Sequence, residues 1–354
     1  MALSIGIVGL PNVGKSTLFN ALTKKGVDAA NYPFCTIEPN VGVVKVPDHR
    51  LELLANISKA AKIINATVEF IDIAGLVRGA STGEGLGNKF LTHIRECDAI
   101  CEVVRDFENK DIIHVDGRID PKGDEETIGM ELIFADLATI DKRLEKLARE
   151  VKSGDKDAAK QKLLFERIKV ALDAGTPARS LEYNEEELIF LKTLNLLTAK
   201  PMLYVVNMDD PKNSESFGWQ GEVIKLNIKL EEEIANLPEE DQAEYIKELG
   251  LDESGLDKLI RAAYKLLGLD TFFTTGVVET RAWTIKHGSK APQAASVIHT
   301  DFEKAFIRAE VISVDKFVEA GSEAKAREMG WLRTEGKDYV VNDGDTCNFL
   351  VNRV

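Results

Sequence analysis

The hydrophobic positions near the start of the chain form one short continuous run, from Ser4 to Gly9. A run of this length is too short for a helix and is typical of a buried parallel strand. Further apolar runs occur at Thr67 to Ile73, Ala99 to Val104 and Pro201 to Asn207, and the stretches between them are long enough for crossover helices. This alternation predicts a doubly wound α/β sheet.

A different pattern follows the third run. Apolar residues recur there at steps of four and three, as in an amphipathic helix with a heptad-like repeat: Ile133, Leu137, Ile140, Leu144, Leu147 and Val151. A second helical pattern follows residues 153–155 and ends near Gly175 and Pro177, so the two helices can form an antiparallel hairpin. We therefore predict a helical insertion at residues 126–195, within an α/β domain formed by residues 1–125 and 196–279.

From residue 280 the pattern changes to short β-like segments, at Arg281 to Ile285, Ala309 to Ser313, Asp338 to Val341 and Cys347 to Val351. Asp343 and Gly344 favour a turn that joins the last two segments as a hairpin. The stretches Pro292 to Phe306 and Val314 to Arg327 have helical patterns. We predict a separate α+β domain at residues 280–354, a common size for a small domain.

Charge and composition narrow the classes of partner. The chain has 354 residues with 59 acidic and 45 basic side chains, a net charge of -14, so as a whole it repels nucleic acid and we expect no DNA partner. No apolar stretch approaches the ~20 residues that span a bilayer, so we expect no membrane partner. The four cysteines lack the spacing of a zinc site, which favours reduced thiols and a cytoplasmic location: Cys35, Cys97, Cys101 and Cys347.

Residues Gly9 to Ser16 read Gly-Leu-Pro-Asn-Val-Gly-Lys-Ser and match the G-x-x-x-x-G-K-[ST] phosphate-binding loop in full. The motif follows a predicted strand and precedes a helical segment, which is the context that it requires. We expect Lys15 to reach the β- and γ-phosphates of a nucleotide and the Ser16 hydroxyl to bind Mg²⁺. The predicted nucleotide-binding residues of this loop are Asn12, Val13, Gly14, Lys15, Ser16 and Thr17.

Three further residues fit the magnesium and γ-phosphate end of such a site. Asp72 lies at the end of the second apolar run, where an aspartate holds Mg²⁺ through water, and the Gly75 amide could contact the γ-phosphate. Thr36 follows Ser16 by twenty residues, the position at which a threonine of a switch loop completes the Mg²⁺ shell. We therefore predict a metal site made of Ser16, Thr36 and Asp72, with Asp72 acting through water.

The residue that positions the attacking water stays open. Leu76 occupies the place at which Ras-type GTPases carry the catalytic glutamine. His114 is a candidate replacement because a neutral imidazole can position water, and the alternative is a strand-edge histidine without a role. Asn12 could help to bind a monovalent cation such as K⁺, or could only stabilise the loop. Glycines at 79, 83, 85 and 87 favour a switch segment that nucleotide state could order.

The fourth run ends in Asn207-Met208-Asp209-Asp210, where GTPases carry N-K-x-D, whose aspartate binds guanine. Here an Asn207 amide can pair with adenine N6 and N7, and the apolar Met208 can cover a purine ring. Asp210 nevertheless occupies the position of a guanine-binding aspartate. The motif therefore leaves the base open and slightly favours adenine.

Together these motifs resemble the YchF/Obg-like ATPase family along essentially the whole chain. The resemblance rests on Gly9 to Thr17, Phe34 to Pro39, Asp72 to Val77 and Phe90 to Arg95, in this order. It implies a P-loop domain of the translation-factor GTPase class, an inserted helical hairpin, and a C-terminal TGS domain of ubiquitin-like β-grasp fold around Arg281 to Val354.

The resemblance also implies an ATPase that associates with the ribosome or its 50S subunit and RNA. By position Asn207 would contact adenine and Met208 would contribute a binding contact, whereas Asp210 departs from the glutamate of the family's N-x-x-E motif. We expect a slow, Mg²⁺-dependent ATPase that acts as a nucleotide switch on the ribosome. Two alternatives stay open: an Obg-type GTPase with the same machinery, and a ribosome- or RNA-binding adaptor in which the nucleotide is structural.

Overall fold

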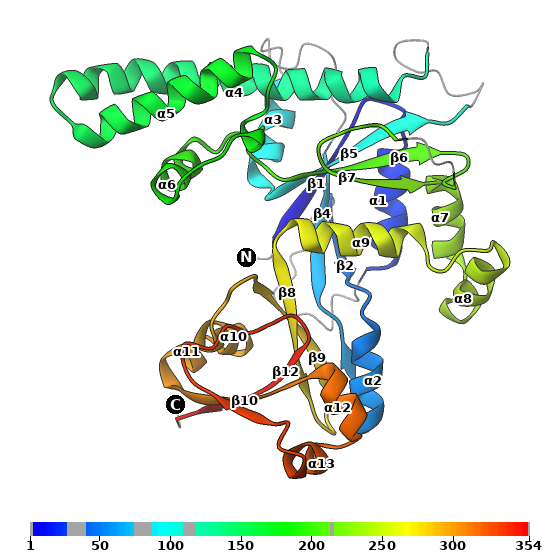
Figure 1. The fold of residues 1–354 in the computed structure, drawn as a ribbon. Coiled ribbons are helices and arrows are strands. Elements are labelled where there is room, and N and C mark those ends of the chain that lie inside the picture. The colour runs from blue at the N-terminus through cyan, green and yellow to red at the C-terminus, as the bar shows by residue number, and fades with distance from the viewer. Residues whose placement is uncertain (1–2, 27–39, 74–85, 109–117, 213–215, 353–354) are drawn as a thin grey trace. The chain divides into compact units, whose positions relative to one another are not determined.

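The computed structural model describes residues 3–26, 40–73, 86–108, 118–212 and 216–352. The chain divides into two compact units, residues 1–42 with 69–259 and residues 43–68 with 260–354. Figure 1 labels most of the helices and strands of both.

The first unit is built on a six-stranded sheet. Its order is β2 (Val41–Lys45), β4 (Thr67–Asp72), β1 (Ser4–Val8), β5 (Ala99–Asp106), β6 (Met202–Met208) and β7 (Glu222–Leu226). The strands from β4 to β7 pair in parallel, and β1 and β6 are buried along their whole length, as in sheets covered on both faces. The predicted α/β class is confirmed, and the four predicted apolar runs correspond to β1, β4, β5 and β6.

Helical segments connect the parallel strands of this sheet, as the crossover pattern requires, except that β7 follows β6 without a described helix between them. The helices are α1 (Lys15–Lys24), α3 (Leu86–Glu96), α4 (Pro121–Lys152), α5 (Lys156–Asp173), α6 (Glu185–Leu194), α7 (Ile228–Asn236) and α8 (Glu239–Glu248), with a short 3-10 turn at Ala178–Ser180. The helix α9 (Gly255–Leu266) follows, and its residues from 260 onward are counted with the second unit. Because the strands are parallel, the loops after β1, β5, β6 and β7 meet at one edge of the sheet. This edge carries the candidate site.

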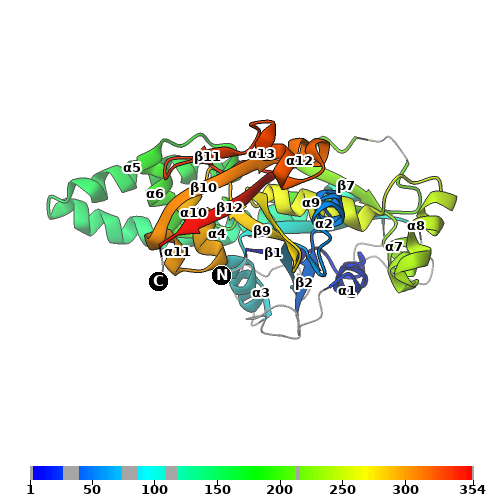
Figure 2. The ribbon, with the colours of Figure 1, turned by 90° about the horizontal axis from the view of Figure 1, so that it is seen from below.

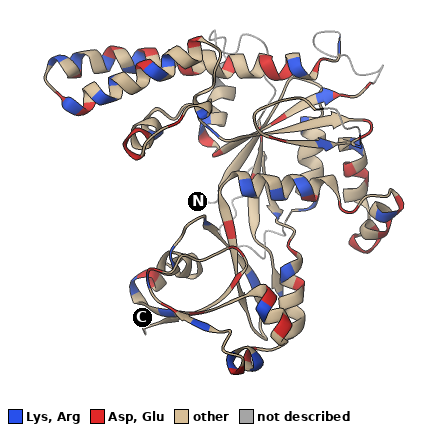
Figure 3. Ribbon diagram, in the orientation of Figure 1, with Lys and Arg blue, Asp and Glu red and all other residues tan. Residues whose placement is uncertain are grey.

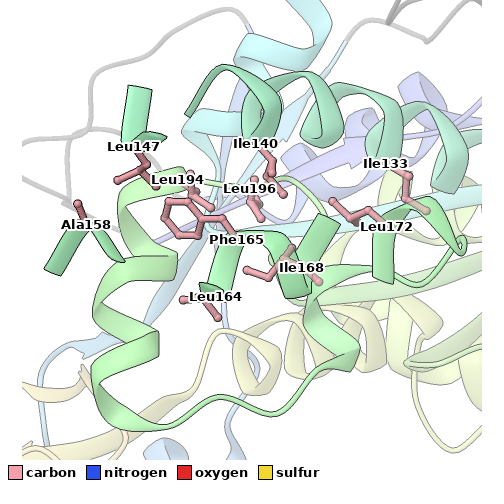
Figure 4. Close-up of a cluster of buried hydrophobic side chains, with 11 residues drawn as sticks. Ile133, Ile140, Leu147, Ala158, Leu164, Phe165, Ile168, Leu172, Leu194 and Leu196 are labelled. Carbon is pink, nitrogen blue, oxygen red and sulfur yellow. The ribbon is translucent and has the colours of Figure 1, made fainter. Parts of the chain in front are cut away.

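The inserted hairpin consists of α4 and α5, which lie side by side in Figures 1 and 2. A hydrophobic cluster of its own holds it together with α6, including Ile140, Phe165 and Ile168, none of which is exposed (Figure 4). The helix α4 begins at Pro121, earlier than the predicted insertion boundary at 126, because the Asp120 side chain caps it by accepting from the Gly123 amide.

The second unit holds a mixed six-stranded sheet and several short helices. The strand order is β11 (Arg333–Glu335), β10 (Phe306–Ser313), β12 (Asp345–Val351), β8 (Leu269–Thr275), β9 (Thr280–Lys286) and β3 (Ile63–Ile64). The helices are α2 (His49–Ser58), α10 (Ala291–Ile298), α11 (Asp301–Ala305), α12 (Val314–Ala320) and α13 (Glu323–Glu328). The predicted α+β class of this part is confirmed, and the narrower TGS assignment stays a prediction.

The structure corrects three details of the C-terminal prediction. The unit starts before residue 280, since β8 pairs with β9 along its whole length and residues 43–68 join the same unit. Asp338 to Val341 is not a strand, and the predicted hairpin through Asp343 and Gly344 is wrong, because Val340 forms only an isolated bridge to Lys290. Each predicted helix is split in two; Gly321, with φ of 69°, ends α12 before α13.

A fully buried carboxyl group lies on the central strand β5. Glu102 has no exposed surface, and neither of its carboxyl oxygens has a hydrogen-bond partner in the described structure. Burial raises the pKa of this carboxyl well above its ordinary value, Glu125 raises it further, and Arg179 opposes the shift. The protonated form of this carboxyl is therefore favoured in the folded protein.

The cysteines of the described residues are buried free thiols, namely Cys97, Cys101 and Cys347. Burial raises the pKa of the Cys97 thiol to about 11, which disfavours the reactive thiolate. Cys35 lies outside the described residues. Along the described ranges, each helix is too short or too polar to span a bilayer.

Candidate functional site

A cavity of about 680 Å³ opens at the edge of the first sheet where the strands end. Ligands of open α/β sheets bind at this edge, and the volume lies in the range of small-molecule pockets. The lining comes from the segments that follow β1, β5, β6 and β7: Asn12, Gly14, Lys15, Ser16, Thr17, Phe107, Glu108, Asn207, Met208, Asp209, Asn227, Ile228, Lys229 and Glu232. The structure thus brings most of the predicted loop residues together with the fourth motif.

The loop after β1 leaves the N-terminus of α1 open toward this cavity. Gly14, the residue before the helix, has φ of 106°, a conformation that only glycine adopts without strain. Among the described residues no side chain caps the first turn of α1, so its backbone N–H groups are available to an anion. Val13 is fully buried and is not among the residues that line the cavity, and its carbonyl accepts a hydrogen bond from Asn207.

Lys15 is held inside the loop. Its side chain is buried, and Nζ donates a hydrogen bond of 2.7 Å to the Leu10 carbonyl. Burial lowers the pKa of this ammonium to about 8, and the nearby Asp72 carboxylate raises it in part. A phosphate would restore the favourable environment of the charged form, so Lys15 is suited to bind one.

Ser16 and Asp72 meet at the mouth of the loop, as the sequence predicted. Ser16 Oγ lies 3.5 Å from Asp72 Oδ2, although the two residues are far apart in sequence. Burial raises the Asp72 pKa, while Lys15 and Ser16 lower it. A hydroxyl and a carboxylate are the oxygen donors that Mg²⁺ takes from a protein when phosphates supply further ligands, so these residues fit the ion. The described residues contain no cluster of three or more His, Cys, Asp or Glu suited to a metal.

Asn207 connects the two ends of the cavity. Its Nδ2 donates to the Val13 carbonyl over 3.0 Å, and its Oδ1 accepts from the Ile228 amide over 3.1 Å. A Cβ at Gly14 would lie 2.6 Å from Asn207 Nδ2, so side chain and loop are in close contact. Sequence reasoning assigned Asn207 a contact to the base and missed this structural role.

The next residues of the motif differ in their surroundings. Met208 lines the cavity but is buried in a hydrophobic cluster with Val104 and Val206, packed against Phe217 and Trp219. This packing accounts for most of its surface, which weakens the prediction that it covers a purine ring. Asp209 belongs to the cavity lining, whereas Asp210 does not among the described residues. Asp210 Oδ1 instead accepts from the Lys212 amide over 3.0 Å, in a turn.

Several residues that line the cavity belong to no sequence motif and were therefore not predicted. Phe107 and Glu108 follow β5, and the buried Arg105 supports them by donating from Nε to the Phe107 carbonyl and stacking on the Phe107 ring. Asn227 caps α7 by accepting from Leu230 and also donates to the Asp209 carbonyl. The available signal was positional: a residue directly after a parallel strand lies at the ligand edge.

Other predicted site residues lie outside the described part of the chain. They are Thr36, Gly75, His114 and the switch glycines 79, 83 and 85, together with Leu76. Their assignments stay predictions.

Comparisons with known proteins agree with this geometry. Residues 4–132 match a family described as 50S ribosome-binding GTPase, and residues 269–352 match the YchF C-terminal family, described as a protein of unknown function (DUF933). The proteins of Bacillus subtilis and Haemophilus influenzae called ribosome-binding ATPase YchF are each 51% identical to this chain, over 99% of it and 100% of their own length. The structure of the Schizosaccharomyces pombe YchF GTPase matches with a TM-score of 0.87 at 38% identity, covering 98% of this chain and 97% of the other. This chain therefore belongs to the YchF family.

Proposed function

We propose that this protein is a Mg²⁺-dependent ATPase that binds and hydrolyses ATP and acts as a nucleotide switch associated with the ribosome. The observation that carries the proposal is the meeting of an uncapped helix N-terminus, Lys15 and the Ser16–Asp72 pair at one end of a nucleotide-sized cavity. The names of the relatives, which are ribosome-binding ATPases, support it.

At the phosphate end, the amides of the first turn of α1 would bind the phosphates and Lys15 would neutralise their charge. Mg²⁺, when bound, supplies further positive charge at the β- and γ-phosphate oxygens. Ser16 would ligate the ion directly and Asp72 would hold one of its waters, with Thr36 as the third predicted ligand. We further propose Gly75 as a γ-phosphate contact.

At the base end, Asn207 supports an adenine. After its bonds to Val13 and Ile228, the amide keeps one N–H and one lone pair, which match adenine N7 and N6. The exposed Asp210 accepts a hydrogen bond from the Lys212 amide, and this contact disfavours a hydrogen bond from Asp210 to guanine in this arrangement. An Obg-type GTPase stays the alternative, since Asp209 lines the cavity and one relative is described as a GTPase.

The water-positioning group is proposed to be His114, or a K⁺ ion bound beside Asn12, in place of the glutamine that Leu76 replaces. Turnover without a catalytic glutamine is expected to be slow.

The partner that we propose is the ribosome, through the 50S subunit and its RNA, with the α4–α5 hairpin as a contact surface. Basic and acidic side chains alternate along this hairpin (Figure 3), so contact with RNA would use a basic subset of its surface. A ribosome-associated role corresponds to a cytoplasmic location.

Calorimetric titration with non-hydrolysable ATP and GTP analogues in Mg²⁺ tests the base assignment. We expect at least a tenfold preference for ATP, about 1.4 kcal/mol; a preference for GTP would establish the GTPase alternative instead. Lys15→Ala should abolish turnover, whereas Lys24→Ala at the other end of α1 should leave it unchanged. Unchanged turnover in a folded Lys15→Ala variant would contradict the proposal, and ribosome cosedimentation that ignores both nucleotide and Lys15→Ala would favour the adaptor.

A further inference from the structure

A second cavity, of about 610 Å³, lies between α3, α4 and the end of α6, away from the residues of the nucleotide site. The charged side chains of its lining, among the described residues, are all basic: Arg95 from α3, and Lys142 and Arg143 from α4. The chain as a whole, in contrast, has a net charge of -14. The cavity is therefore a local exception to the charge of the whole molecule.

The two α4 cations are not neutralised by carboxylates. Within the described ranges Lys142 forms no ion pair, and Arg143 donates from Nη2 to the neutral Gln161 Oε1 over 3.1 Å. Among the described residues no carboxylate therefore screens the positive potential of these two side chains toward a ligand. Lys142 is exposed, so it can reach an anion without the cost of leaving another partner.

On the α3 side of the cavity, Arg95 is held in place by contacts to neighbouring residues. It donates to the Asn195 carbonyl over 2.9 Å and to Thr139 Oγ1 over 3.0 Å, and it lies 4.0 Å from Asp136 Oδ1. The Asp136 carboxylate is itself fully buried and accepts from the backbone amides of Leu197 and Thr198. Those bonds satisfy much of its charge, so Asp136 only partly offsets the three cations.

The remaining surface is apolar. Leu91 and Leu194, both buried, and Ala138 give the cavity a hydrophobic floor beside the cations. A volume of about 610 Å³ exceeds one phosphate and accommodates a phosphate joined to a sugar and base. We propose that this cavity binds a phosphate-bearing nucleotide unit, with Lys142 and Arg143 on the phosphate and the apolar floor under the sugar or base.

Two sources could supply this chemistry: a free nucleotide or polyphosphate, and a unit of an RNA strand. Either ligand would bridge α3 to α4. The inference does not depend on ATP hydrolysis at Lys15, and its test reports on a different cavity.

The test uses the full chain with its P-loop saturated by Mg²⁺ and a non-hydrolysable ATP analogue, so that the probes reach only other sites. Fluorescence anisotropy measures binding of a labelled tetraribonucleotide at low salt, and inorganic pyrophosphate serves as competitor. The variant is Lys142→Ala with Arg143→Ala. Its matched control is Lys146→Ala with Arg149→Ala, the next basic pair on α4, which lies outside the lining.

The expected result is a loss of affinity of about tenfold or more in Lys142→Ala/Arg143→Ala and less than about twofold in the control. Displacement by pyrophosphate would identify free phosphates as a sufficient source; failure to displace would identify the sugar-phosphate strand. An equal loss in both double variants would show general attraction to α4 and overturn the proposal, as would absence of binding below about 1 mM. ATP turnover and urea unfolding of each variant establish that it is folded.

Discussion

The buried amide of Asn207 allows the most direct test of how the site is built. Asn207→Ala removes two hydrogen bonds at once, to the Val13 carbonyl and from the Ile228 amide. Both backbone groups belong to residues with at most 1% exposure. Each unsatisfied group costs about 1–3 kcal/mol, so we expect the two together to lower the free energy of unfolding by about 2–6 kcal/mol, the lower end applying where water enters.

The same change should weaken every ligand that uses the phosphate-binding loop. Urea unfolding measures the stability, and calorimetry measures binding of ATP, GTP and inorganic triphosphate with Mg²⁺. If Asn207 acts through the loop, affinity for triphosphate, which has no base, falls together with that for ATP. Asn207→Asp is the matched variant, because it keeps the acceptor for the Ile228 amide and loses the donor to Val13. A variant that loses ATP affinity while its stability and triphosphate affinity are unchanged would refute the structural role and leave only base contact.

Three further outcomes follow from the described contacts. Burial lowers the Lys15 pKa to about 8, so affinity for ATP should fall as pH rises through that value, and titrations of Lys15→Met should lack this step; a flat profile in the unmodified protein would contradict it. Phe107→Ala should weaken ATP binding by about 1–3 kcal/mol if the base stacks there, and triphosphate binding should be unaffected. The raised pKa of Glu102 means that the folded state holds a proton that the unfolded state releases, so stability should decline as pH rises above the ordinary glutamate pKa. Urea unfolding of Glu102→Gln should show a flatter pH dependence and higher stability at pH 8.

The phosphate end was predictable because its chemistry is local in sequence. One loop supplies the glycines, Lys15 and Ser16 in a fixed spacing, and the strand that ends in Asp72 is recognisable from its apolar residues. The doubly wound sheet and the hairpin followed from periodicity for the same reason.

The base end was less predictable because its contacts are made between segments. Nothing in the sequence around Asn207 indicates that its side-chain amide donates to the Val13 carbonyl and accepts from the Ile228 amide. Phe107 has no motif, and its place depends on the support of Arg105. The start of the C-terminal unit was mispredicted for the same reason. The strand β8 belongs to this unit because it pairs with β9, and the local sequence pattern near residue 269 does not reveal that pairing.

The length of α4 means that a small rotation at its start produces a large displacement at its end. At 1.5 Å per residue, its 32 residues extend about 48 Å without a break from the sheet to the far end of the hairpin. A rotation of only 5° about its base would displace the far end by about 4 Å, the size of a side-chain contact. A rearrangement too small to disturb the packing near Pro121 is therefore large enough to make or break an interaction at the tip.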